Sequence, residues 1–244
     1  SYTAKVVLDT DDKTIELKDS ELNYTIQAAE VTVMWNIPSG PIYYDGNDHA
    51  LTAEVKSGNK ILDPKLYSVK IYKNVSDTTP LDPGEYTNAG EYTARVELTD
   101  TKNYSFRSED ENYTTYHINK RPLFVSWTDG KLVYNGSDQA PIPTVTELEE
   151  KDISDVYVVN VYKNLEDTKA LGKGEYTDAG SYVVKVEIKE EYKINYGFWK
   201  NTEEYKEYEI EKIGLDVVWG NKDLTYNGEN QAPTAEVMID DSMV

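Results

Sequence analysis

The chain has 244 residues, a formal net charge of −20 and no cysteine. Without cysteine it forms no disulfide bond or thiolate zinc site, and so acidic a surface repels nucleic-acid phosphates and anionic lipid. Tyrosine is abundant, with 21 Tyr against three Phe and three Met, and tyrosine suits half-buried strands. No apolar stretch approaches the ~18 residues of a membrane span. We therefore expect an all-β protein with no nucleic-acid partner and no membrane insertion.

In chain order, short segments between residues 28 and 119 alternate apolar and polar side chains, as strands with one buried face do. Turn residues such as Pro38–Gly40 and Asp82-Pro83-Gly84 separate them. The predicted strands are Val31–Trp35, Leu51–Val55, Leu66–Tyr72, Glu91–Leu98 and Tyr113–Ile118. Several short strands with regular turn signals favour a sandwich or a small barrel.

An internal repeat is the strongest feature of the sequence. Trp35, Trp127 and Trp219 are each 92 residues apart, and each precedes a Tyr-(Asp/Asn)-Gly triplet at residues 44–46, 134–136 and 226–228. Residues 84–90 recur as 174–180, and the segment 91–98 recurs as 181–188 and again as 1–8. A fixed period of this kind indicates tandem copies of one structural unit.

The repeat predicts four parts along the chain. Residues 28–119 and 120–211 are two full repeats, residues 1–27 are the C-terminal part of an upstream repeat, and residues 212–244 are the N-terminal part of a downstream one. A permuted frame that begins at the Ala-Gly-x-Tyr strand is the alternative. The junctions contain no Gly/Ser-rich tether, which favours a stiff, elongated array. The partial ends expose strand edges, so we expect them to pack on a neighbouring module or to self-associate head-to-tail.

A local motif indicates the kind of sandwich. The run Asn88-Ala89-Gly90-Glu91-Tyr92 and its copy at residues 178–182 resemble the tyrosine corner of immunoglobulin-like sandwiches, in which a Tyr bonds back to upstream backbone. Tandem immunoglobulin-like β-sandwich modules are therefore the expected fold, with β-grasp-like modules as the alternative. The repeated Trp residues are expected to pack in a core or between modules, and carbohydrate stacking is the alternative role.

The sequence offers no convergent catalytic set. The only histidines, His49 and His117, lack counterparts in the next repeat, where Gln139 and Glu209 stand. The acidic clusters at residues 9–12, 109–111 and 147–152 lack the spaced ligands and central Gly of a calcium loop. We expect no enzymatic activity, no cofactor, no catalytic residue and no metal site.

A covalent Lys–Asn cross-link between strands is a further structural alternative. Lys5 and Lys185 occupy matching places in their repeats, but Arg95 stands there in the first full repeat. A cross-link common to all modules is therefore not expected.

The order of motifs carries a family resemblance. Trp, then Tyr-(Asp/Asn)-Gly, Gln-Ala-Pro, Gly-x-Tyr, Ala-Gly-x-Tyr and Asn-Tyr-x-Phe together resemble the YDG/MBG-type repeats of bacterial surface proteins, and the resemblance covers nearly the whole chain. The first copy departs from it at residues 47–51, where Gln-Ala-Pro is missing. The resemblance implies a secreted, cell-surface or cell-wall protein, often an adhesin, and no catalytic residues.

Two functions follow from the repeat and the resemblance. The leading one is a non-catalytic stalk or adhesive array. The alternative is direct binding of a host or cell-surface glycan or protein, with Tyr44, Asp45, Tyr134 and Asn135 as the ligand-contact loop. The other interpretation of this loop is hairpin-turn chemistry, since Asp-Gly and Asn-Gly are strong turn signals.

Overall fold

The computed structural model describes residues 1–108, 111–149, 151–239 and 242–243. The chain divides into two compact units, Ser1–Lys120 and Arg121–Val244, one residue beyond the expected junction between full repeats. Strands make up 42% of the residues and helical segments 3%, so the all-β prediction is confirmed. The described residues contain no α-helix. A β-grasp module, the alternative fold, would have a helix packed against its sheet.

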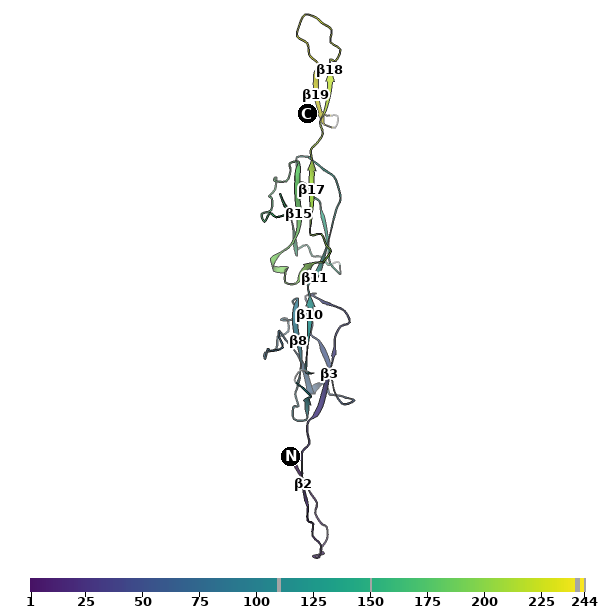
Figure 1. The fold of residues 1–244 in the computed structure, drawn as a ribbon, viewed down its shortest axis with the longest axis vertical. Helices are drawn as coiled ribbons and strands as arrows, with labels where there is room; N and C mark the ends of the chain where they lie inside the picture. The colour runs from purple at the N-terminus through teal and green to yellow at the C-terminus, as the bar shows by residue number, and fades with distance from the viewer. Residues whose placement is uncertain (109–110, 150, 240–241, 244) are drawn as a thin grey trace. The chain divides into compact units, whose positions relative to one another are not determined.

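In the first unit, residues 29–119 form a sandwich of two four-stranded sheets. Figure 1 labels β3 of one sheet and β8 and β10 of the other. One sheet has the order β6 (Lys60–Ile61), β5 (Thr52–Ser57), β3 (Ala29–Asn36) and β9 (Tyr104–Phe106). The other has the order β4 (Ile42–Tyr43), β10 (Tyr113–Asn119), β8 (Gly90–Leu98) and β7 (Tyr67–Tyr72). The pairs β3–β9 and β4–β10 are parallel and the others antiparallel. We call residues 29–119 the first sandwich.

Side chains from both sheets fill the core of the first sandwich. Val31 and Val55 from one sheet pack with Val96 from the other, and all three are fully buried. A second cluster is built around Tyr92 and Ile118, and Trp35 packs against both clusters. The alternation along β8 explains this, because every second residue faces the opposite sheet.

A long loop after β7 covers part of the outer face of β8. Arg95 points outward from β8 and donates hydrogen bonds to the carbonyls of Val75 and Asp77 in that loop. Thr93 lies on the same outward face of the strand and is 1% exposed. The guanidinium of Arg95 therefore supplies hydrogen-bond donors to two carbonyls of an irregular segment.

The second unit repeats this architecture in residues 121–211, with three described strands rather than four in one of the sheets. We call residues 121–211 the second sandwich. One sheet has the order β13 (Pro143–Thr146), β11 (Arg121–Trp127) and β16 (Tyr196–Phe198). The other has the order β12 (Leu132–Val133), β17 (Tyr205–Glu211), β15 (Gly180–Ile188) and β14 (Tyr157–Tyr162). The short 3-10 segments η1 (Pro64–Leu66) and η3 (Glu190–Tyr192) stand in the first and second sandwich respectively.

The two sandwiches agree in strand register. Trp35 lies opposite Ala53, and Trp127 lies opposite Pro143, each on the first pair of long strands. Lys185 donates to the carbonyls of Leu165 and Asp167, in the place where Arg95 anchors the loop of the first sandwich. This loop-anchoring role differs from the cross-linking role considered for Lys185.

Two further hairpins flank the sandwiches in sequence. The N-terminal hairpin consists of β1 (Tyr2–Lys5) and β2 (Glu21–Tyr24). The C-terminal hairpin consists of β18 (Asp216–Gly220) and β19 (Thr234–Ile239), to which β20 (Ser242–Met243) adds. Tyr2 lies opposite Tyr24, just as paired tyrosines lie opposite each other in β8–β10 and β15–β17. Trp219 lies opposite Ala235, just as the repeated Trp lies opposite a residue of the next long strand in β3–β5 and β11–β13.

Candidate functional site

The first half of the predicted ligand-contact loop is a tied-down turn. Tyr44 is half-buried, packs against the core cluster of Tyr92 and donates its backbone N–H to Asn119. Asp45 accepts a hydrogen bond from the backbone of Asn47 and lies 2.9 Å from Nε2 of His49. Burial opposes ionisation of Asp45, but these two partners hold the pKa of its carboxyl below the ordinary value. The Asp45 carboxylate thus stabilises the turn itself through these two contacts.

The second half of the loop has the same backbone but a more exposed ring. Asn135 accepts a hydrogen bond from the backbone of Ser137 at 3.0 Å, as Asp45 does from Asn47. Tyr134 donates its backbone N–H to Glu211, yet its residue is 39% exposed. The structure therefore places the two pairs of predicted residues in separate units, and Tyr134 is the more exposed of the two tyrosines.

The Asp-Gly and Asn-Gly turns are not hairpin turns. β4 pairs with β10 and β5 pairs with β3, so the turn after Tyr44 carries the chain from one sheet to the other. Gly46 and Gly136 have φ values of +87° and +79°, a region that favours glycine. The short-range signal correctly indicated a turn, but the strands on either side belong to different layers.

An aspartate missed by the sequence reasoning fastens this region to a second loop. Asp48 accepts a hydrogen bond from the backbone of Gly84 at 2.8 Å, and Asp138 accepts the same bond from Gly174 at 2.8 Å. The recurrence of Asp at these places in the two repeats is the signal that could have revealed it. The candidate loop is thereby held at both of its ends.

The predicted hydrogen bonds from Tyr92 and Tyr182 back to upstream backbone are confirmed. Tyr92 donates its hydroxyl to the carbonyl of Asn88 at 2.9 Å, and Tyr182 donates to the carbonyl of Asp178 at 3.0 Å. Both rings are almost fully buried, and each stacks on a Tyr of the neighbouring strand with centroids 5.8 Å apart. These tyrosines are structural groups whose rings lie in the core.

The repeated tryptophans occupy equivalent places with different exposure. Trp35 and Trp127 are partly buried and pack against core clusters, and Trp127 also donates its indole N–H to the carbonyl of Glu203. Trp219 is 53% exposed on the C-terminal hairpin. Core packing is thus the observed role of the first two.

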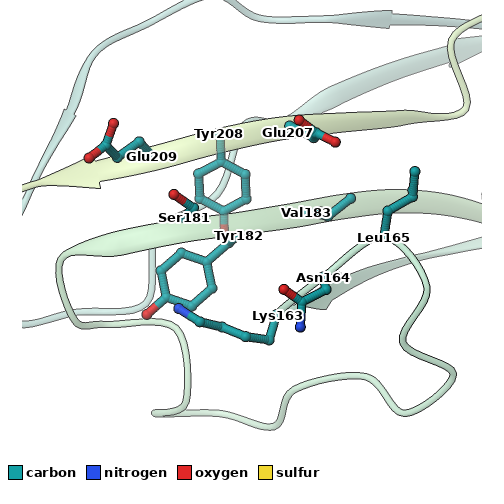
Figure 2. Close-up of a pocket in the computed structure, with 9 residues that line it drawn as sticks. All are labelled: Lys163, Asn164, Leu165, Ser181, Tyr182, Val183, Glu207, Tyr208 and Glu209. Atoms are coloured by element: carbon teal, nitrogen blue, oxygen red, sulfur yellow. The ribbon is translucent and has the colours of Figure 1, made fainter.

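A surface hollow of the second sandwich, about 500 Å³ in volume, lies beside Tyr182 (Figure 2). Lys163 holds its ammonium nitrogen 4.0 Å from the centre of the Tyr182 ring. Glu207 and Glu209 come from β17 and stand two residues apart, opposite Val183 and Ser181 of β15. The hollow therefore presents one ammonium group, two carboxylates and a serine hydroxyl.

The polar lining of this hollow is specific to the second sandwich. No histidine lines it, so the serine has no imidazole base beside it. At the equivalent places of the first sandwich, His117 lies opposite Glu91, and Thr115 lies opposite Thr93. Lys73 over Tyr92, at 4.2 Å, is the feature that the two sandwiches share.

Titratable side chains show no metal-ligand geometry in the part of the chain that the structure describes. Within those residues no three His, Asp or Glu side chains are grouped so that they could hold an ion. Of the acidic clusters singled out by sequence, Glu109, Asp110 and Glu150 lie outside the described residues. Glu147 is committed to an ion pair, since its carboxylate contacts the buried guanidinium of Arg121.

Comparison with protein-family models, curated proteins and solved structures gave no match to this chain. Among the described residues, no helix has both the length and the apolar character needed to cross a membrane.

Proposed function

We propose that the chain is a non-catalytic repeat region, a stalk or adhesive array, of a secreted or cell-surface bacterial protein. The observation that carries the proposal is that both sandwiches share strand order, register and the stacked tyrosine pair, while their exposed polar groups differ. Repetition of an interior supplies stability and spacing to every module. A reactive centre repeated at equivalent places would have argued for catalysis instead.

We also propose that each sandwich is an immunoglobulin-like module of the YDG/MBG type. The tyrosine-corner bonds of Tyr92 and Tyr182 and the two facing sheets support this assignment. The order of sequence motifs supports it independently. The parallel pairs β3–β9 and β4–β10 distinguish this topology from a purely antiparallel sandwich.

Small-angle scattering tests the stalk directly. A compact chain of 244 residues would have a radius of gyration of about 18 Å. A stiff array gives a value at least about twice as large, with a scattering profile that stays the same between low and high salt. A value near 18 Å, or the profile of freely jointed modules, would contradict the stalk.

Direct ligand binding is the second candidate, and the exposed ring of Tyr134 favours it. An open tyrosine on a rigid turn can stack on a sugar or on a protein side chain with little loss of conformational entropy. A glycan array and a mucin-binding assay on the purified chain test this. Binding that is lost in Tyr134→Ala, retained in Tyr134→Phe and accompanied by unchanged thermal unfolding would establish the loop as a contact site.

A further inference from the structure

The Asn-Gly turn of the second sandwich places two groups that can react with each other at the surface. Asn135 and Gly136 are both exposed, and a Cβ added to Gly136 would meet no atom within 4 Å. When Gly follows Asn, its backbone nitrogen can approach the side-chain amide carbon of the Asn, because no Cβ obstructs it. The turn is therefore a candidate for a covalent change within the chain itself.

The turn holds the Asn135 side chain by its carbonyl oxygen. That oxygen accepts a hydrogen bond from the backbone N–H of Ser137 at 3.0 Å. The hydrogen bond polarises the amide carbon and stabilises the negative charge that develops on the oxygen when a nucleophile attacks this carbon. The contact leaves the amide nitrogen, which is the leaving group in such an attack, outside the hydrogen bond.

Other asparagines of the sandwiches are held differently. Asn164 donates its amide nitrogen to Asp167 at 3.3 Å, and Leu165 follows it. Asn74 makes the equivalent hydrogen bond in the first sandwich at 3.2 Å, and a Val follows it. In both, the leaving group is bound and a branched side chain stands beside the attacking nitrogen. These two asparagines are internal references for Asn135.

The first sandwich shows that an acid fits the same turn. Asp45 stands in the place of Asn135 and accepts a hydrogen bond from the backbone N–H of Asn47 at 2.8 Å. Gly46 and Gly136 have φ values of +87° and +79°, so the two turns share their backbone conformation. A carboxylate can therefore replace the amide without loss of the hydrogen bond that closes the turn.

We propose that Asn135 and Asn227 are sites of spontaneous deamidation, with water as the co-reactant. Asn227 lies in the same kind of turn, because its side-chain oxygen accepts the backbone N–H of Glu229 at 3.0 Å and Gly228 has a φ of +83°. Hydroxide takes the proton from the Gly nitrogen, which bonds to the amide carbon of the Asn. The bond from that carbon to the amide nitrogen breaks, and the nitrogen takes a proton from water and leaves as ammonia.

Water then opens the cyclic imide in one of two ways, and no group is oxidised or reduced. Attack at the side-chain carbonyl gives Asp, whereas attack at the main-chain carbonyl gives isoaspartate, whose backbone runs through the side chain. Either product adds one negative charge to the turn. The proposal goes beyond the stalk function and does not rest on it, because it concerns a covalent change within a single turn.

The two products differ in their effect on the loop that contains Tyr134. Isoaspartate lengthens the main chain by one methylene between residues 135 and 136. The chain is fixed on both sides, since Tyr134 donates its backbone N–H to Glu211 at 2.9 Å and Asp138 accepts a hydrogen bond from Gly174 at 2.8 Å. The extra length therefore displaces Tyr134 or releases Asp138, whereas Asp leaves both contacts in place.

Peptide mapping by mass spectrometry tests the proposal on the folded 244-residue chain, incubated at neutral and at mildly alkaline pH. Asn135 and Asn227 should convert at least about 10-fold faster than Asn74 and Asn164, and their rates should rise with pH because hydroxide starts the reaction. Asn135→Gln is the matched control. It keeps an amide but needs a larger ring for the same attack, so residue 135 should then stay unmodified.

Urea unfolding separates the two products. Asn135→Asp should unfold at the wild-type urea concentration, and the isoaspartate form, isolated by ion-exchange chromatography, should unfold at a lower one. An Asn135 that stays an amide in the folded chain, while the urea-unfolded chain converts it, overturns the proposal because the turn then protects the side chain. Equal conversion of Asn74 and Asn164 also overturns it, since the reaction would then not depend on this turn.

Discussion

Removing the guanidinium of Arg121 should destabilise the second sandwich by a large amount. The Arg121 and Glu147 side chains are 5% and 1% exposed, and Nε of Arg121 contacts Oε2 of Glu147. The other carboxylate oxygen of Glu147 accepts backbone hydrogen bonds from Glu149 at 3.0 Å and Lys151 at 2.8 Å. Arg121→Met leaves this carboxylate buried and ionised without its countercharge.

Breaking a buried pair from one side costs about 3–5 kcal/mol, because the remaining charge has lost its solvation and its partner. That is a large part of the stability of a domain, about 5–15 kcal/mol in total. The double variant Arg121→Met/Glu147→Gln removes both charges and keeps an amide oxygen that accepts the two backbone hydrogen bonds. It should regain most of the loss, and the difference between the variants measures the coupling.

Urea unfolding followed by tryptophan fluorescence provides the measurement. Trp127 and Trp199 report on the second sandwich and Trp35 on the first, where Ala29 occupies the place of Arg121. The first-sandwich transition therefore serves as an internal control and should stay unchanged. A cost below about 1 kcal/mol for Arg121→Met, or a double variant no more stable than the single one, would refute the reasoning.

The same pair gives the second sandwich an acid limit. Burial opposes ionisation of Glu147, but the hydrogen bond from Arg121 and the backbone donors lower its pKa below the ordinary value. The native state therefore binds this proton less readily than the unfolded state does. The stabilisation is complete above the unfolded pKa of about 4.3 and is lost as the pH falls through the folded pKa. Acid titration of the double variant should lack this loss.

Three further predictions concern the structure that both sandwiches share. Tyr182→Phe removes the hydrogen bond to Asp178 and should lower stability by about 1 kcal/mol in urea unfolding, whereas Tyr2→Phe, at the equivalent exposed place, should change nothing. Gly180→Ala should cost about 1–3 kcal/mol, since φ is +154° there; a thermal shift below experimental error would contradict it. Burial and the Glu187 carboxylate raise the pKa of Tyr162 to about 12. The free energy of unfolding should therefore fall as the pH rises from about 10, the pKa of an unfolded tyrosine, through about 12. In a tyrosinate absorbance titration, Glu187→Gln should lower the pKa of Tyr162.

The long strands and the repeat could be predicted because their signals are local and occur more than once. The alternation of residues 91–98 specifies which side faces the core, and the structure buries Tyr92, Ala94 and Val96. The copy at residues 181–188 gives the same pattern, which makes the assignment independent of any single residue. The tyrosine-corner bond followed from the same repetition, because it joins residues only four positions apart.

The features that sequence reasoning missed depend on contacts between distant segments. β4 and β12 contain two residues each, too few for an alternating pattern, and they are defined only by their parallel partners near residues 118 and 210. The pair Arg121–Glu147 joins positions 26 apart, and the first sandwich has no counterpart of Arg121 that would have revealed it by repetition. The loop after β7 is long and irregular, so only the structure shows that Arg95 anchors it.

What the two sandwiches share lies inside them, and this bears on what the array can do. Tyr72 bonds Glu97 as Tyr162 bonds Glu187, and the stacked tyrosines, the Trp positions and the loop anchors also coincide. The outward groups beside the hollow do not coincide, since Glu209 stands where the first sandwich has His117. A ligand recognised by these outward-facing polar groups would bind one module and not the other. The property available to every module is therefore a stable, repeatable body, which is what a stalk requires.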